Sequence, residues 1–460
     1  MNENDLKGLK RHQNHLIKVV CLGVIALLLS ACQPEETKTE AQYSELPEVE
    51  IIYNNEDVVA FNNRVNQGQT NRYEGLVIRN SPLLVKPEVL PTALFYDSGI
   101  EIAYPEEGVK GIYLTADTIA DEEYFNYIID YINSTELNAV VIDFKDDHGN
   151  ILPAIDSDNP VIQENVLGAI DLTEVLKVLE ENQIYPIARL VTFKDYLLSD
   201  QFPELSFHDT YTGEIWQDGN GAQFINPFLR EVWDYNLEIA TEAAKMGFKE
   251  IQFDYIRFPE GFESFAEDLE YDIGDYASYV SEDPEEEGYE RVAAINDFLE
   301  YAGDQLAPYG VDISADVFGY TAVAGDAPDV RGIGQNFSQM AEHVDVISSM
   351  IYPSHWGVGF FGIDYPDLHP YDVVTEYMFT EDFALQNVQN SVTSRPWLQD
   401  FTDYFLPEGT YQVYGPQQVQ EQIMALHEQG VHEFLLWNAG GVYTEGVDYA
   451  PEISGIEYYY

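Results

Sequence analysis

The sequence contains very little cysteine. Its 460 residues include only Cys21 and Cys32, and Cys21 lies in an N-terminal stretch that we expect to be removed. A mature chain beginning at Cys32 would hold no disulfide within itself. It would also lack a cysteine nucleophile and a cysteine-ligated metal site.

Basic residues are scarce as well. The chain has 21 Lys and Arg against 82 Asp and Glu, which gives a formal net charge of −61. A chain of this charge repels nucleic acid, so we expect no nucleic-acid partner. The acidic residues are spread along the chain, and we interpret this as adaptation of an exported protein to a salty or alkaline medium. Hydrophobic residues make up 45% and aromatic residues 13%, which excludes disorder of the whole chain.

Several catalytic motifs are missing. The sequence has no HExxH and no paired-histidine spacing, which argues against a zinc site. It has no GxSxG, so a serine hydrolase of the α/β type has no support. We therefore expect no cofactor and no metal. A hard-cation site at Asp143, Asp146 and Asp147 stays open as an alternative.

The N-terminus has the pattern of a secretory signal. Four basic residues precede a short apolar run at 19–29, and the sequence LSAC ends at Cys32. LSAC resembles a lipobox, in which the cysteine is freed by cleavage and lipidated. We expect residues 1–31 to be a lipoprotein signal peptide, and an exported protein held at the cell membrane by lipid on Cys32. An uncleaved anchor helix is the alternative.

The rest of the chain predicts a single large domain. Residues 32–50 form a polar tether and residues 51–108 an irregular N-terminal segment, and from 109 to 460 short apolar strands alternate with helices. The expected strands are 111–116, 139–144, 185–193, 251–258, 311–318, 344–352, 395–401 and 433–438. The helices include 124–132, 172–182, 227–246, 289–306 and 417–429. Eight such units predict an α/β fold, a (β/α)₈ TIM barrel with an irregular N-terminal extension. The alternative, an open doubly wound sheet, lacks the Gly-rich turn after its first strand.

The segment 263–290 interrupts the fourth unit. It holds twelve acidic residues and no Lys or Arg. It is either a solvated insertion or a calcium-binding or lid loop.

Alternation along the strands identifies candidate site residues. In IQFDYIRFP, Ile251 and Phe253 share one face, so Asp254 points into the barrel near the end of its strand. The same reasoning turns Asp316 inward on the next strand. Active sites of barrel enzymes lie at these carboxyl ends. Arg257 follows Asp254 and is expected to keep it ionised.

Other strand ends supply polar and aromatic side chains to the same mouth. These candidate substrate-binding residues are Asp143, Lys145, Arg189, Arg257, Tyr352, His355, Trp356, Trp397, Gln399, Asp400, Trp437 and Asn438. Aromatic faces stack on sugar rings, and the polar groups bond hydroxyls. We expect Trp356, Trp397 and Trp437 to be the stacking platforms. Two carboxylates, Asp254 and Asp316, are what glycosidic cleavage requires.

Several motifs resemble one family. GVKGIYLTA, IDFKDDHG, EIQFDYIRFPEG, ISADVFGYTA, SSMIYPSHW, PDLHPYDVV and RPWLQDFT, spread over 109–441, are similar to exported bacterial proteins classed as glycoside hydrolases, whose domain carries an unknown-function label. The resemblance implies a barrel related to α-amylase-like and α-galactosidase-like enzymes. In those enzymes the nucleophile is an aspartate at the end of strand four, here Asp254.

The same resemblance puts the proton donor on strand five or six. Strand five offers Asp316, whereas strand six offers only Tyr352 and His355. The expected function is hydrolysis of a polysaccharide or oligosaccharide at the cell surface, with Asp316 as an acid of raised pKa. The alternatives are a carbohydrate-binding protein without catalysis and an envelope scaffold.

Overall fold

The structure is a computed structural model that describes residues 95–451 except 156, 282, 284 and 285. The predicted signal peptide, Cys32, the tether and most of the segment 51–108 lie outside the described residues. In the described part, no helix has the length and apolar character needed to cross a membrane.

Eight parallel strands form a closed barrel. They are β1 (Lys110–Leu114), β2 (Ala139–Lys145), β5 (Tyr185–Val191), β7 (Glu250–Asp254), β9 (Asp312–Phe318), β10 (Val346–Met350), β12 (Trp397–Gln399) and β13 (Phe434–Trp437). Each strand pairs with the next in this order, and β13 pairs with β1 to close the barrel. The predicted (β/α)₈ fold is confirmed, with every predicted strand present.

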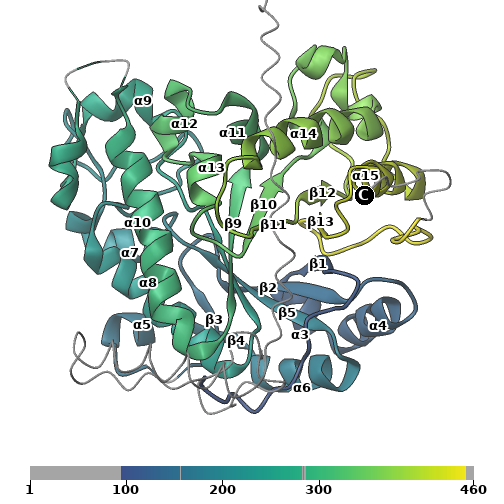
Figure 1. The fold of residues 1–460 in the computed structure, drawn as a ribbon. Coiled ribbons are helices and arrows are strands. Elements are labelled where there is room, and N and C mark those ends of the chain that lie inside the picture. The colour runs from purple at the N-terminus through teal and green to yellow at the C-terminus, as the bar shows by residue number, and fades with distance from the viewer. Residues whose placement is uncertain (1–94, 156, 282, 284–285, 452–460) are drawn as a thin grey trace, which may run out of the picture. The chain divides into compact units, whose positions relative to one another are not determined.

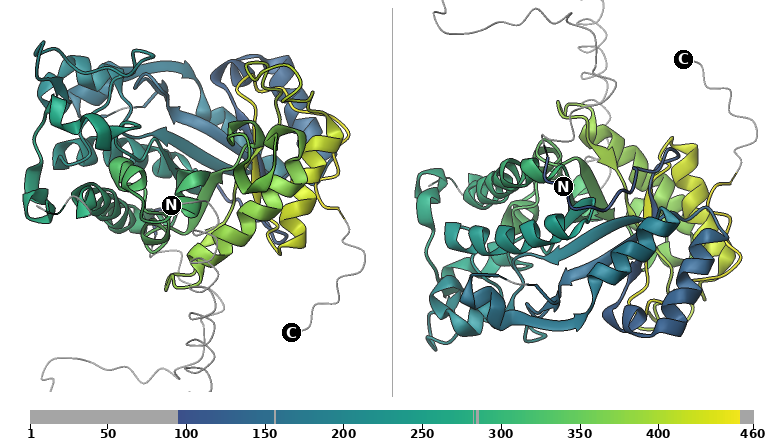
Figure 2. Two further views of the ribbon diagram at one scale, coloured as in Figure 1. Left: turned by 90° about the horizontal axis from the view of Figure 1, so that it is seen from above. Right: turned by 90° about the horizontal axis from the view of Figure 1, so that it is seen from below.

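Helices surround the strands in the views from above and from below (Figure 2). Figure 1 shows α8 (Arg230–Met246) and α10 (Tyr289–Leu306) on one side, and α14 (Pro370–Leu385) and α15 (Pro416–Glu428) on the other. The remaining α-helices are α3 (Ala116–Ala120), α4 (Glu122–Asn133), α5 (Pro160–Asn165), α6 (Leu172–Asn182), α7 (Tyr196–Gln201), α9 (Phe262–Phe265), α11 (Gly319–Ala324), α12 (Pro328–Ile333) and α13 (Phe337–Met340). The sequence predicted α4, α6, α8, α10 and α15, and it missed α14.

Short strands decorate the barrel. Strand β3 (Ile151–Pro153) runs antiparallel to β2 and pairs with β4 (Val166–Ile170), while β11 (Thr393–Ser394) pairs with β10. These pairings lie outside the closed ring of eight strands.

Side chains alternate between two apolar clusters, as expected for a barrel. Val140, Ile142 and Phe144 of β2 pack in the large cluster between strands and helices. Val141 from the same strand packs in a smaller cluster with Ile187 of β5. Because Ile187 lies in this second cluster, the inward direction predicted for Arg189 is confirmed.

Polar residues fill the barrel interior at both ends. At the amino ends of the strands, Arg395 pairs with Glu250 at 2.7 Å, and neither side chain is exposed. Arg395 also bonds Glu433 at 2.8 Å. At the carboxyl ends, the inward positions of β2, β5, β7 and β9 hold the side chains that form the site described below.

The acidic segment 263–290 is folded against the barrel where the structure describes it. Its strand β8 (Leu269–Glu270) pairs with β6 (His208–Asp209), and Tyr276 is buried. Glu290 forms an ion pair with Arg291 at 2.8 Å. The described residues contain no group of three His, Cys, Asp or Glu placed to hold a metal ion, so the calcium interpretation gains no support from this part of the segment.

Candidate active site

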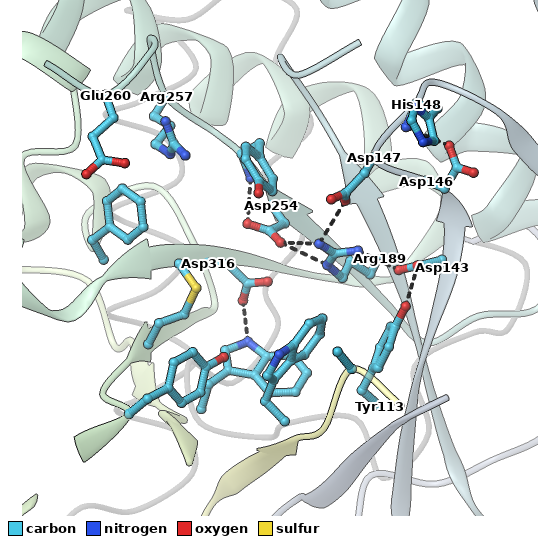
Figure 3. A pocket seen from close by; sticks show the side chains of 17 residues that line it. Tyr113, Asp143, Asp146, Asp147, His148, Arg189, Asp254, Arg257, Glu260 and Asp316 are labelled. Atoms are coloured by element: carbon cyan, nitrogen blue, oxygen red, sulfur yellow. Dashed lines mark hydrogen bonds and ion pairs between the residues drawn. The ribbon is translucent and has the colours of Figure 1, made fainter. Parts of the chain in front are cut away.

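The carboxyl ends of the strands open into a pocket of about 580 Å³ (Figure 3). Its lining residues are Tyr113, Asp143, Asp146, Asp147, His148, Arg189, Asp254, Tyr255, Arg257, Glu260, Asp316, Phe318, Met350, Tyr352, Trp397, Trp437 and Ala439. Eight of the predicted site residues belong to this set: Asp143, Arg189, Asp254, Arg257, Asp316, Tyr352, Trp397 and Trp437. The position of the pocket agrees with the general location of barrel active sites.

Asp254 ends β7 and receives three hydrogen bonds. Its Oδ2 accepts from Arg189 Nη2 at 2.5 Å and from Arg189 Nε at 2.9 Å. Its Oδ1 accepts from the backbone N–H of Tyr255 at 2.6 Å. All three groups donate, so the arrangement favours the ionised carboxylate.

The backbone turns sharply directly after Asp254. Tyr255 has a φ of +48°, which is uncommon for a residue with a side chain. The turn ends β7 at Asp254, and the strand predicted over 251–258 is therefore too long. Backbone strain of this kind is typical of functional sites, and here it brings the Tyr255 N–H onto the Asp254 carboxylate.

Asp316 lies beside Asp254 on the neighbouring strand. Strands β7 and β9 pair Phe253 with Ala315, so the next residue on each strand is an inward-facing aspartate. Asp316 is 2% exposed, and Trp397 Nε1 donates to its Oδ1 at 2.8 Å. Burial, followed by the negative charge of Asp254, raises the pKa of Asp316 well above its ordinary value. The two carboxyl groups therefore favour opposite protonation states.

Arg189 joins three carboxylates (Figure 3). Besides Asp254, it bonds Asp143 Oδ1 through Nη1 at 2.7 Å and Asp147 Oδ1 through Nη2 at 3.4 Å. Tyr113 donates its hydroxyl to Asp143 Oδ2 at 2.6 Å. Burial opposes the charge of Arg189, but the three carboxylates outweigh it and raise the pKa of Arg189.

The neighbours of Arg189 titrate in different directions. Burial raises the pKa of Asp143, although Arg189 and Tyr113 oppose the shift. Burial acts the same way on Asp147, but there Arg189 and Lys194 prevail and lower its pKa. Lys194 bonds Asp147 Oδ2 at 3.1 Å.

The predicted partner of Asp254 was wrong. Arg257 lines the pocket, but its hydrogen bond runs from Nη1 to the backbone oxygen of Phe258 at 3.2 Å. Arg189, from the adjacent strand, is the cation that bonds Asp254. The sharp turn at Tyr255 carries the chain away before residue 257, so sequence proximity misidentified the partner.

Lys145 does not face the pocket, contrary to its predicted inward direction. It is fully buried and forms an ion pair with Asp195 at 2.7 Å, with a further bond to Asn236 of α8 at 3.0 Å. The pairing register of β2 with β5 shifts between Asp143 and Lys145. This bulge breaks the alternation on which the prediction rested.

Two of the three predicted tryptophan platforms lie elsewhere or offer little surface. Trp356 packs against Phe360, Phe361 and Tyr377, outside the pocket. Trp397 lines the pocket but is 1% exposed, so its main contact is the hydrogen bond to Asp316. Trp437 lines the pocket and is more open, with Arg189 lying 5.6 Å from its ring centre.

Four further predicted residues organise loops and do not line the pocket. Gln399 accepts a bond from the Ser354 N–H and donates to Asp367. The backbone N–H and hydroxyl of Thr444 both donate to Asp400. Asn438 donates to the backbone oxygen of Asp400. His355 is exposed, and its ring nitrogen Nδ1 lies 2.9 Å from the Ser354 hydroxyl.

The prediction of site residues left out several that line the pocket. Tyr113 could have been found by alternation along GIYLTA, because it shares the inward face of β1. Tyr255, Glu260 and Phe318 follow strand ends, where the same logic applies less strictly. Asp146 and Asp147 were considered only as cation ligands. In the structure Asp147 pairs with Arg189 and Lys194, and Asp146 accepts bonds from the Asn150 side chain and backbone.

The fold and the pocket together define a class of protein, a closed (β/α)₈ barrel with a carboxylate–arginine site at the carboxyl ends of its strands. Residues 111–443 match a family model described as "Putative glycosyl hydrolase domain". This match covers most of the chain, and the protein belongs to that family. No curated protein sequence matches the chain significantly.

Solved structures show the same fold. The glycoside hydrolase domain of PgaB (BpsB) from Bordetella bronchiseptica is 14% identical, with 72% of this chain and 94% of that chain covered and a TM-score of 0.51. A hypothetical protein from Ruminiclostridium thermocellum is 36% identical over 45% of this chain and 97% of that chain, with a TM-score of 0.38. An α-galactosidase from Thermus thermophilus is 11% identical over 75% of this chain and 60% of that chain, with a TM-score of 0.42.

Proposed function

We propose that the protein hydrolyses glycosidic bonds in a polysaccharide by a two-carboxylate mechanism. The observation that carries the proposal is the pair Asp254 and Asp316, adjacent on neighbouring strands and held in opposite protonation states. Family membership supports a glycosidase-like activity, and the family's glycoside hydrolase neighbours support a carbohydrate substrate.

The roles follow from the hydrogen bonds. Asp316 gives its proton to the glycosidic oxygen as the bond from that oxygen to the anomeric carbon breaks. Asp254, kept ionised by Arg189, lies against the positive charge that develops on the sugar. It either attacks the anomeric carbon, after which water hydrolyses the glycosyl ester, or activates the attacking water. Trp437 is the aromatic surface best placed to contact a sugar ring.

Reducing-end release from a broad polysaccharide panel tests the activity. The enzyme is the soluble chain that begins after Cys32, assayed in high salt to screen its own charge. Asp254→Asn and Asp316→Asn are expected to abolish release while circular dichroism and thermal unfolding stay close to wild type. Full activity in Asp254→Asn would contradict the role of that residue.

Leaving-group chemistry separates the two roles. A nitrophenyl glycoside of the identified sugar needs little protonation of its leaving group. Asp316→Asn should therefore retain much more activity on this substrate than on the polymer, whereas Asp254→Asn should lose both. Equal losses on both substrates in Asp316→Asn would argue against Asp316 as the acid.

A protein that binds glycans without cleaving them is the alternative. It predicts no release from any polymer but measurable glycan affinity that survives in the Asp254→Asn/Asp316→Asn double variant. An envelope scaffold predicts neither release nor saccharide affinity. Calorimetry against the same panel distinguishes these outcomes.

We further propose that the protein is exported and held on the outer side of the cell membrane by lipid on Cys32. The support is the signal-like sequence before LSAC. Metabolic labelling with palmitate should mark the wild-type chain and not Cys32→Ala. Equal labelling of both chains would refute this anchor.

A further inference from the structure

Arg257 is a buried cation without an acidic partner. It is 7% exposed, and within the described part of the chain its printed hydrogen bond is the one to Phe258 O. None of the ion pairs found among the described residues includes it. Burial lowers the pKa of Arg257, in contrast to Arg189, whose pKa three carboxylates raise. Burying a charge without a counter-charge is costly, so the protein retains this arginine at a cost to stability.

Aromatic rings fix the position of the Arg257 guanidinium. Its central carbon lies 4.7 Å from the ring centre of Phe318, 4.8 Å from that of Tyr255 and 5.7 Å from that of Phe224. Such contacts stabilise a cation and limit its rotation. The guanidinium is therefore preorganised before any ligand arrives.

Arg257 stands between two cavities. It lines the main pocket and also an adjoining pocket of about 190 Å³, which Lys194, Asp218, Asn220, Ala222, Phe224, Tyr255 and Glu260 also line. Lys194 supplies a second cation there, with its ring contact to Tyr255 at 4.5 Å. In Figure 3, Arg257 and Glu260 lie at one end of the row of side chains, and Asp143, Asp146 and His148 lie at the other.

We propose that Arg257, assisted by Lys194, binds a carboxylate of the substrate, so that the substrate class is a glycan containing uronic acid beside the cleaved bond. This inference rests on the proposed glycosidase function and specifies its substrate. The planar fork of an arginine matches the two oxygens of a carboxylate. Hydroxyl groups of a neutral sugar would not compensate a buried positive charge.

The charges around the small pocket limit the ligand to a single negative charge. Asp218 and Glu260 line it, and Lys194 is already paired with Asp147. A doubly charged phosphate ester would meet both carboxylates and is disfavoured. A carboxylate carries one charge, as a sulfate ester does, so these two are separated by experiment.

Binding is measured first, on a protein that cannot consume the ligand. Calorimetry uses the Asp254→Asn chain with oligosaccharides from polygalacturonate, alginate and hyaluronan, and with the carboxyl-reduced neutral forms of the same oligosaccharides. We expect at least one acidic oligosaccharide to bind roughly 10- to 100-fold more tightly than its reduced form, the effect of a hydrogen-bonded charge pair. Oligosaccharides of chondroitin sulfate provide the sulfate arm.

Substitutions then assign the effect to Arg257. Adding Arg257→Gln should weaken binding of the acidic form roughly 10- to 100-fold and leave the neutral form almost unchanged. Arg257→Lys should restore part of the preference, because it keeps the charge and loses the fork. Glu260→Gln is the matched control, which removes a neighbouring charge of opposite sign and should not weaken acidic binding.

The outcomes separate this inference from the proposed function. Equal binding of acidic and reduced oligosaccharides by the parent chain would overturn the inference, even if Arg257→Gln failed to fold. Preference for sulfated over carboxylated glycans would also overturn it. Cleavage of neutral polysaccharides that is unchanged in Arg257→Gln would support the glycosidase and refute the acidic substrate. Acidic binding through Arg257 without cleavage would support the subsite and refute the enzyme.

Discussion

Replacing Trp397 with phenylalanine tests whether Asp316 is the proton donor. Trp397 Nε1 donates to Asp316 Oδ1 at 2.8 Å, and a donor of this kind stabilises the ionised carboxylate over the protonated acid. Burial and the charge of Asp254 raise the pKa of Asp316, and the Trp397 bond opposes them. A hydrogen bond to a charged group contributes roughly 1.5–3 kcal/mol, and one pKa unit corresponds to about 1.4 kcal/mol. Losing the bond should therefore raise the pKa of Asp316 further, by about 1–2 units.

The assay is the pH dependence of kcat/KM on the polysaccharide that the wild type cleaves. A general acid must be protonated, so activity falls as the pH rises through its pKa. In Trp397→Phe this alkaline limb should move to higher pH by about 1–2 units. Trp437→Phe is the matched control, because it loses the same group from the adjacent ring, which has no bond to Asp316 in the described structure. Its limb should stay in place. An unmoved limb in a folded Trp397→Phe protein would refute Asp316 as the titrating acid.

Two predictions concern stability at the amino end of the barrel. Arg395→Met should destabilise the fold by roughly 3–5 kcal/mol, because Glu250 is left buried and unpaired. Adding Glu250→Gln should recover much of that loss, and urea unfolding that shows additive losses would contradict the argument. Burial, with Glu250 and Asp345 nearby, raises the pKa of Asp312 to about 6. The folded state then holds this proton more tightly than the unfolded state, so the contribution is present at low pH and is lost as pH rises from about 4 to 6. Asp312→Asn should remove a slope on the order of 1–3 kcal/mol over this range, and an unchanged slope would contradict it.

The strands and their inward faces could be predicted because the apolar pattern is regular. Ile251 and Phe253 define the outward face of β7, and that alone turns Asp254 toward the mouth. The same logic worked for Arg189 and Asp316. It failed at Lys145 because a bulge in β2 changes the alternation, and no residue in AVVIDFK signals that bulge.

Helix α14 was missed for a different reason. Phe379 and Phe383 are exposed on it, alongside buried apolar residues such as Val374 and Tyr377. Apolar side chains therefore occur on both faces, and the helical period that predicted α6 and α10 is obscured.

The pairing of charges in the site could not be read from the sequence. Arg257 is three residues from Asp254, and Arg189 is 65 residues away, yet Arg189 makes the bond. Two facts decide this. Asp254 and Arg189 lie on paired strands, where inward side chains meet at the same level, and the turn at Tyr255 diverts the chain after Asp254. Sequence proximity reports neither the pairing of strands nor a positive φ.

The two arginines on either side of Asp254 now have distinct physical roles. Arg189 contacts three carboxylates of its own chain, so little of its charge is left for a ligand, and its effect is to keep Asp254 ionised. Arg257 contacts rings and a backbone oxygen, so its charge is available to the pocket. In a chain with 21 basic and 82 acidic residues, carboxylates that could pair with an arginine are abundant. A buried arginine left without one beside a carboxylate-rich pocket is therefore best explained by an anion that the substrate brings.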